Sequence, residues 1–162
     1  AATNDNFMLK PANYNDGDII AMDRAYIDYA RFEELTNRGV TYVTKMKKNL
    51  VYDTLSDTMY MLPCGLMECR VQVVEFRKHI KGGENIKHKA RIVTYVDPAK
   101  KKAKVISLLT NDMTMEGEDI IDIYRQRWEI ELLFKQLKQN FPLKYFYGEN
   151  ANAIKIQIWV RL

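Results

Sequence analysis

The chain has 162 residues, of which 47% are hydrophobic and 28% are charged, a composition typical of one globular domain with a core of its own. This balance excludes an intrinsically disordered chain. No run of about 18 apolar residues occurs, and the N-terminus lacks the basic and then apolar order of a signal peptide. We therefore expect a cytoplasmic protein with no membrane partner.

The net charge is +4, but the charge is unevenly distributed along the chain. Residues 40–110 hold fourteen Lys or Arg against six Asp or Glu, whereas residues 1–39 hold four against seven and residues 111–162 hold seven against eight. A basic block between two mildly acidic ones indicates either a surface that faces a polyanion or a lysine-rich face in water. Charge alone does not separate these two interpretations.

Two cysteines and two histidines lie in the middle of the chain, namely Cys64, Cys69, His79 and His88. These residue types can ligate zinc, but their spacings match no common zinc finger or ribbon. Two reduced thiols in a cytosolic protein are the favoured interpretation.

A strand, a helix and a second strand are predicted near the N-terminus. Residues 18–23 are a compact apolar run ending in Asp23, residues 28–38 have the period of an amphipathic helix that Gly39 stops, and residues 40–47 return to strand character. Ligands of open α/β sheets bind at the carboxyl ends of strands, so Asp23 is a candidate metal ligand. The equally favoured alternative is that Asp23 caps the turn or helix that follows.

Strand-like runs rich in Val, Ile, Thr and Tyr fill residues 50–110 and predict an antiparallel β meander. The clearest hairpin joins residues 91–97 to residues 104–110. On the strand before this meander, Lys45 and Lys47 would share one face, where they meet either a phosphate backbone or water.

The longest predicted element is a helix that starts at the N-cap candidates Asn111, Asp112 and Thr114 and runs to about Gln139, before Pro142. At about 100° per residue, one polar stripe of this helix holds four side chains: Tyr124, Arg127, Glu131 and Lys138. Such a stripe is often only a charged boundary, in which an i,i+4 ion pair supports the helix by a few tenths of a kcal/mol, roughly.

The spacing Tyr124-x2-Arg127-x3-Glu131-x6-Lys138 resembles, at every fixed position, the Y-R-E-K signature of bacterial insertion-sequence DDE transposases. The segment Asp23-Arg-Ala-Tyr, which follows an apolar strand, is similar to the box that carries the second aspartate of that group. The order of the motifs, with a β-rich segment between them, agrees as well.

The resemblance implies an α/β (α+β) fold, with a truncated RNase H-like catalytic core and an inserted antiparallel β subdomain. Residues 1–48 would belong to the core and residues 49–110 would be the β-rich insertion. Residues 111–162 would supply the core helix with Glu131 and the start of a following helix.

The resemblance also implies a metal site and a DNA substrate. In this family three carboxylates hold two divalent ions, Mg²⁺ with Mn²⁺ as the alternative, and these ions activate the attacking oxygen and stabilise the leaving oxygen in phosphoryl transfer. Asp23 and Glu131 would be catalytic metal ligands. The transposon end would be held by Tyr124, Arg127 and Lys138. Lys135 is not part of the signature, but it lies about 40° from Glu131 around the helix and would add a phosphate contact.

The first aspartate of the family has no match, since Asp5, Asp16 and Asp18 lie too close to Asp23 to stand on an earlier strand. We therefore expect an incomplete fragment that is inactive alone. Its partners would be double-stranded DNA of the transposon ends and the target, and a second copy on that DNA in the nucleoid. Two alternatives remain: a non-catalytic DNA-binding remnant of a transposase, and an RNase H-like nuclease without strand transfer.

Overall fold

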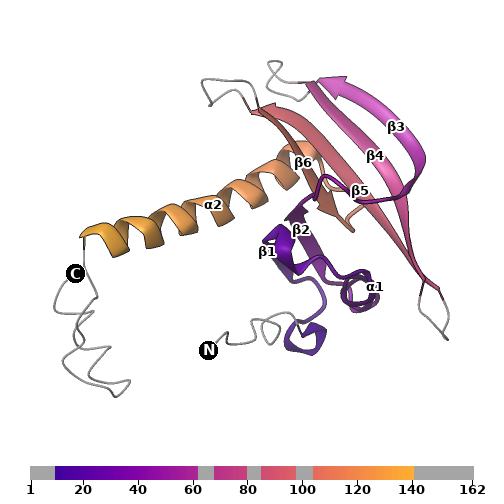
Figure 1. Ribbon diagram of the computed structural model, residues 1–162, viewed down its shortest axis with the longest axis horizontal. Helices are drawn as coiled ribbons and strands as arrows, with labels where there is room; N and C mark the ends of the chain where they lie inside the picture. Colours follow the sequence, from indigo (N-terminus) through magenta and orange to yellow (C-terminus); the bar gives the residue numbers. More distant parts are fainter. Residues whose placement is uncertain (1–9, 62–67, 80–84, 98–103, 141–162) are drawn as a thin grey trace. The chain divides into compact units, whose positions relative to one another are not determined.

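The computed structural model describes residues 10–61, 68–79, 85–97 and 104–140. The chain divides into two compact units, residues 1–125 and residues 126–162. The first unit contains a six-stranded sheet in the order β1-β2-β6-β5-β4-β3 (Figure 1). Its strands are β1 (Ile19–Met22), β2 (Thr41–Lys45), β3 (Asp53–Met61), β4 (Glu68–Lys78), β5 (Ile86–Asp97) and β6 (Lys104–Thr110).

The predicted strand, helix and strand at the start of the chain are confirmed as β1, α1 (Tyr29–Asn37) and β2. Asp28 caps α1, because its side chain accepts a hydrogen bond from the amide of Ala30. Gly39 ends the helix at φ 71°, a left-handed conformation that glycine adopts at little cost. The connection returns the chain alongside β1, so β1 and β2 pair in parallel.

The predicted meander is also confirmed, and each of its neighbouring strands pairs in antiparallel fashion. Its last strand, β6, pairs with β2, so one sheet passes without a break from β1 to β3. The boundary between residues 1–48 and 49–110 therefore divides one sheet, and the division into residues 1–48, 49–110 and 111–162 stays a prediction as a division of function.

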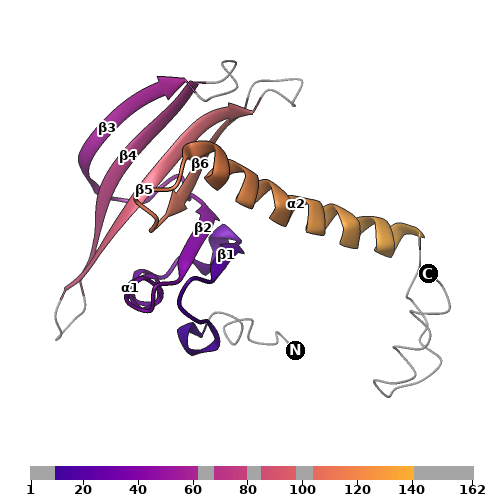
Figure 2. The same ribbon diagram turned by 180° about the vertical axis from the view of Figure 1, so that it is seen from behind.

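Side-chain alternation along the strands separates two apolar clusters on opposite faces of the sheet. On one face, α1 packs against β2 and β5 (Figure 2) and contributes Phe32 and Leu35 to a cluster with Tyr42, Ile92 and others. On the other face, the first turns of helix α2 (Gly117–Asn140) contribute Ile120 and Ile121 to a cluster with Val43, Val93, Tyr95 and Leu108. The overall class is a mixed α+β fold.

Three predicted boundaries differ from the structure. Strand β2 ends at Lys45, so Lys47 lies beyond it, and β3 starts at Asp53 rather than at Val51, where the predicted run begins. Helix α2 starts at Gly117, whereas the cap candidates before it belong to a turn. The helix predicted to follow Pro142 lies outside the described residues.

Candidate functional site

Asp23 follows the last residue of β1, and its side chain caps the 3₁₀ turn Arg24–Tyr26 by accepting a hydrogen bond from the amide of Ala25 at 2.9 Å. The cap that the sequence offered as one of two roles is therefore present. A carboxylate has about four lone-pair positions on its two oxygens, so a cap bond and metal ligation are compatible on one side chain.

The direction of the Asp23 side chain follows from strand alternation. Met22 packs in the cluster under α1, and the backbone of Asp23 is still extended at φ −73° and ψ 148°. Ala21 aligns with Val43, which packs beneath the first turns of α2. Because residues two apart in an extended chain share a face, Asp23 points to the face of the sheet on which α2 starts.

Lys45 is the nearest cation to Asp23 in the register of the sheet. Met22 aligns with Thr44 in the parallel pair, so the next position on each strand brings Asp23 and Lys45 side by side, about 5 Å apart between the strands. Lys45 thus joins the candidate site. The sequence placed it on a suitable face, but only the register of β1 and β2 makes it a neighbour of Asp23.

Helix α2 carries the remaining predicted site residues. Tyr124 is half-buried and packs against the cluster on the α2 face of the sheet. Arg127 Nη1 lies 2.5 Å from Oε1 of Glu131, with side chains 13% and 48% exposed. The i,i+4 ion pair of the boundary interpretation is therefore present. Lys135 is exposed, and the side chain of Lys138 lies outside the described part of the chain.

Asp23, Lys45 and Tyr124 belong to the first compact unit, whereas Arg127, Glu131 and Lys135 belong to the second. Joint ligation of one metal by Asp23 and Glu131 therefore stays a prediction. Their chemistry fits magnesium, since both are partly exposed carboxylates and hard cations prefer oxygen ligands. Within the described residues, no group of three or more His, Cys, Asp or Glu could hold a metal.

The cysteines and histidines of the zinc alternative that the structure describes are apart from one another. His88 is fully buried on the α1 face, Cys69 is buried on the α2 face, and exposed His79 bonds Asn85. Cys64 lies outside the described residues. Opposite faces of one sheet do not share a zinc ion, so the zinc interpretation is wrong for Cys69 and His88.

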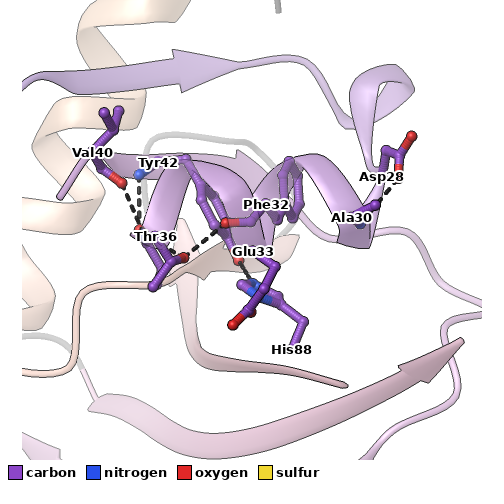
Figure 3. Close-up of polar contacts among 9 residues, drawn as sticks. Asp28, Ala30, Phe32, Glu33, Thr36, Val40, Tyr42 and His88 are labelled. Carbon is purple, nitrogen blue, oxygen red and sulfur yellow. Dashed lines mark hydrogen bonds and ion pairs between the residues drawn. The ribbon is translucent and has the colours of Figure 1, made fainter. Parts of the chain in front are cut away.

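His88 instead belongs to a buried polar chain that sequence reasoning missed. Its Nε2 lies 2.6 Å from the hydroxyl of Tyr42, and its Nδ1 lies 2.8 Å from Oε2 of Glu33. Figure 3 shows the imidazole between these two side chains, which come from β2 and α1. Burial lowers the pKa of His88, against the opposing effect of Glu33. The neutral imidazole therefore ties α1 to β2 and β5.

Asn111 was also missed, and it ties the end of β6 to the same elements. Its amide nitrogen donates to Thr36 Oγ1 at 2.9 Å and to the carbonyl of Val40 at 2.8 Å. Its amide oxygen accepts from the amide of Tyr42 at 2.9 Å. These partners lie about 70 residues away in sequence, and for this reason Asn111 was read only as a helix cap.

A mixed α+β domain with a six-stranded sheet, an aspartate after a parallel strand and a glutamate on a long helix is consistent with the RNase H-like class of transposase domains. The family described as "Transposase DDE domain" matches residues 1–162. The chain belongs to this family.

Relatives named as transposases match most of the chain. It is 30% identical over 142 residues to one for insertion sequence element IS4SA from Synechocystis sp., with 87% of this chain and 37% of the relative covered. It is 26% identical over 140 residues to transposase y4zB of Sinorhizobium fredii, with 86% and 38% covered. A third, for insertion sequence element IS5377 of Geobacillus stearothermophilus, is 24% identical over 153 residues, with 87% and 36% covered.

The chain thus spans a little over a third of the length of these relatives. Among its described residues, no helix is both long enough and apolar enough to cross a membrane.

Proposed function

We propose that this chain is part of the catalytic domain of a DNA transposase, which cleaves DNA at transposon ends and joins them to target DNA by metal-dependent phosphoryl transfer. The observation that carries the proposal is the direction of Asp23. It follows a parallel strand and faces the side of the sheet on which α2 starts, and α2 carries Glu131. The family membership makes DNA the expected substrate.

In this proposal Asp23 and Glu131 hold Mg²⁺, or Mn²⁺ as the alternative. The bound ions supply Lewis-acid activation of the attacking oxygen and charge stabilisation at the leaving oxygen. Glu131 forms an ion pair with Arg127 through Oε1 alone, and a carboxylate has two oxygens, so this ion pair and metal ligation are compatible on one side chain.

The cations and the phenol near these carboxylates hold the DNA. Arg127 and Lys138 neutralise phosphate charge, Lys135 adds a contact one turn after Glu131, and Tyr124 supplies a ring for stacking on a base. Lys45, the register neighbour of Asp23, adds a further positive charge at the strand ends. The polar side chains position the DNA, and the carboxylates with their ions perform the chemistry.

The protein would act on double-stranded transposon ends and target DNA in the nucleoid, as a homodimer that binds both ends. Only two carboxylates of the chain match the three of the family, so we expect the 162-residue chain alone to be inactive in cleavage. Cleavage of a transposon end by this polypeptide alone would disprove that expectation.

The test uses the full-length transposase and a duplex that carries its transposon end. We expect Asp23→Asn and Glu131→Gln each to lower the Mg²⁺-dependent cleavage rate by about a hundredfold or more, because each removes a metal ligand. Glu129→Gln is the matched control, since Glu129 is an exposed carboxylate on the same helix, two residues from Glu131. Unchanged cleavage by Glu131→Gln would overturn the assignment.

The same experiment separates the two alternatives. A non-catalytic remnant would bind the duplex and give no cleavage even as the wild type. A simple nuclease would cleave without joining the cut end to target DNA, and loss of Arg127 or Lys138 would not affect discrimination between transposon ends and random duplex.

A further inference from the structure

The segment between β6 and α2 is an ordered turn built on Asp112. Its Oδ1 accepts hydrogen bonds from the amides of Thr114 and Met115, at 2.8 and 2.7 Å, and from the hydroxyl of Thr114 at 3.1 Å. Burial opposes the charge, but these donors hold the pKa of Asp112 below its ordinary value. The turn therefore directs its N–H groups toward a charged carboxylate and leaves its carbonyl groups for another partner.

That partner is Arg91, which reaches the turn from the middle of β5. The residue is 7% exposed, and Nη1 donates to the carbonyl of Met113 at 3.2 Å. Nη2 donates to the carbonyl of Met115. The guanidinium and the carboxylate of Asp112 thus hold opposite ends of one peptide group, the one between Met113 and Thr114, and the charge of Arg91 also lowers the pKa of Asp112.

Burial of a guanidinium is costly unless all of its donors are satisfied. Nε of Arg91 is buried and makes no hydrogen bond within the described part of the chain. An apolar side chain of similar volume would avoid this cost, so stability alone does not account for an arginine here. The two carbonyl contacts point to a positional role.

A second contact from the β-rich segment fixes the first residue of the helix. Tyr60, on β3, accepts a hydrogen bond at its hydroxyl from the amide of Gly117 at 3.2 Å. A Cβ at position 117 would lie 2.3 Å from that hydroxyl oxygen and 3.2 Å from Sγ of Cys69. Strands β3, β4 and β5 therefore each provide a side chain close to Gly117 or to the turn before it.

We propose that Arg91 and Tyr60 are positioning residues for the transposition reaction. Through their contacts with residues 113, 115 and 117, the β-rich segment fixes the position and direction of the start of helix α2. The proposal rests on the proposed function, because its purpose is to place Glu131. Glu131 lies fourteen residues after Gly117, on the order of 20 Å along the helix axis. A tilt of about 10° at the start would move Glu131 by about 4 Å, which exceeds a metal–oxygen bond of about 2 Å.

The first experiment tests these contacts without catalysis, by measuring amide hydrogen exchange at the start of α2 in the 162-residue chain. We expect Arg91→Met to raise exchange of amides 113–121 by about tenfold or more, and Tyr60→Phe to raise exchange of the Gly117 amide by about fivefold. Exchange in β1 and β2 should not change. Arg70→Met is the control, since Arg70 is a half-exposed arginine on the neighbouring strand with its own partner, Asp57.

The second experiment uses the full-length transposase and compares cleavage with binding of the transposon end in Ca²⁺. We expect Arg91→Met to lower cleavage about a hundredfold while its Kd changes less than about threefold, because the helix is misdirected rather than lost. Arg91→Lys keeps one donor for a carbonyl and should recover part of the rate. Tyr60→Phe, the milder variant, should lower cleavage with an unchanged Kd even if Arg91→Met does not fold.

Unchanged exchange at residues 113–121 in both Arg91→Met and Tyr60→Phe would disprove the claim that Arg91 and Tyr60 hold the start of α2 in place. Equal losses of binding and cleavage in Tyr60→Phe would overturn the positioning role, because they would indicate general destabilisation. A wild-type protein that does not cleave would instead refute the proposed function, and the exchange result would still stand by itself.

Discussion

Among single residues, His88 has the most unusual environment. Its imidazole is fully buried between Tyr42 and Glu33, and burial lowers its pKa below the ordinary 6.5 despite the opposing effect of Glu33. Because the folded state binds a proton less readily than the unfolded state, stability rises with pH across this range. The contribution is complete above the unfolded pKa and is lost as pH falls through the folded pKa.

We therefore predict that the free energy of unfolding decreases as pH falls from about 7.5 to about 5.5, with a slope of at most about 1.4 kcal/mol per pH unit from this group. Urea denaturation at several pH values measures the slope. In His88→Gln the slope should vanish, whereas His79→Gln, which alters the exposed histidine, should retain it. A slope that persists in His88→Gln would assign the effect to another group.

The sequence could not reveal this environment. The partners of His88 lie 46 and 55 residues away, so no local pattern marks them. Asp23, by contrast, was identifiable because strand ends and caps are local features, and its 3₁₀ cap was among the predicted roles. The burial of Arg91 was equally hidden, because a lone arginine in a strand reads as a surface residue.

At the scale of elements, the start of α2 gives a prediction whose sign opposes the usual rule. Replacing glycine by alanine in a helix ordinarily stabilises a protein by about 0.5–1 kcal/mol. At Gly117 the added methyl group would lie 2.3 Å from the hydroxyl oxygen of Tyr60. We predict that Gly117→Ala destabilises the chain by about 1–2 kcal/mol, measured by urea denaturation.

The partner in this clash can be tested separately. In a Tyr60→Phe background the hydroxyl is absent, and the nearest remaining atoms would be Sγ of Cys69 at 3.2 Å and the ring carbon Cζ at 3.4 Å from the new Cβ. The cost of Gly117→Ala should therefore be smaller in that background, and the difference is the coupling free energy of the pair. Equal costs in both backgrounds would contradict the contact.

Elements with a strong local pattern were predicted well, and their ends were not. Strand β6 and helix α1 occupy nearly the predicted residues, whereas β5 starts at Ile86, five residues before the predicted hairpin strand of residues 91–97. The start of α2 was predicted several residues early because Asp112 has the character of an N-cap, yet its carboxylate accepts the amides of a turn that precedes the helix. Arg91 donates to the carbonyl of Met113 in this turn. Because Arg91 is distant in sequence, the local pattern around Asp112 does not show that its carboxylate accepts the amides of the turn.

At the scale of the whole molecule, the sequence showed the β-rich segment but not its attachment. Pairing of β6 with β2 makes that segment continuous with the strands around Asp23, and pairing between distant strands is not a local property. Several cations of residues 40–110 already have carboxylate partners in the fold. Arg70 pairs with Asp57, Arg77 pairs with Glu75 and Asp53, and Lys78 lies 3.9 Å from Asp28.

The cations that remain available for DNA are therefore fewer than the sequence suggests. Lys87 and Lys89 are exposed on β5, and within the described residues neither forms an ion pair, since Glu75 opposite Lys89 is held by Arg77 at 2.9 Å. Both lie on one face of the strand, because they are two residues apart. If the basic segment binds duplex DNA, these two lysines are exposed neighbours that can contact phosphates.

We predict that Lys87→Gln with Lys89→Gln weakens binding of duplex DNA and lowers the slope of log K against log salt by up to about 1.8, near 0.9 for each lost phosphate contact. Titrations at several salt concentrations measure this slope. Arg70→Gln with Asp57→Asn is the charge-balanced control: it also changes two exposed residues but removes a cation that already has its own carboxylate, so its slope should equal that of the wild type. Equal losses in both double variants would mean that pairing within the sheet does not withdraw an arginine from DNA. A wild-type affinity that does not depend on salt would exclude the basic segment as a DNA-binding surface.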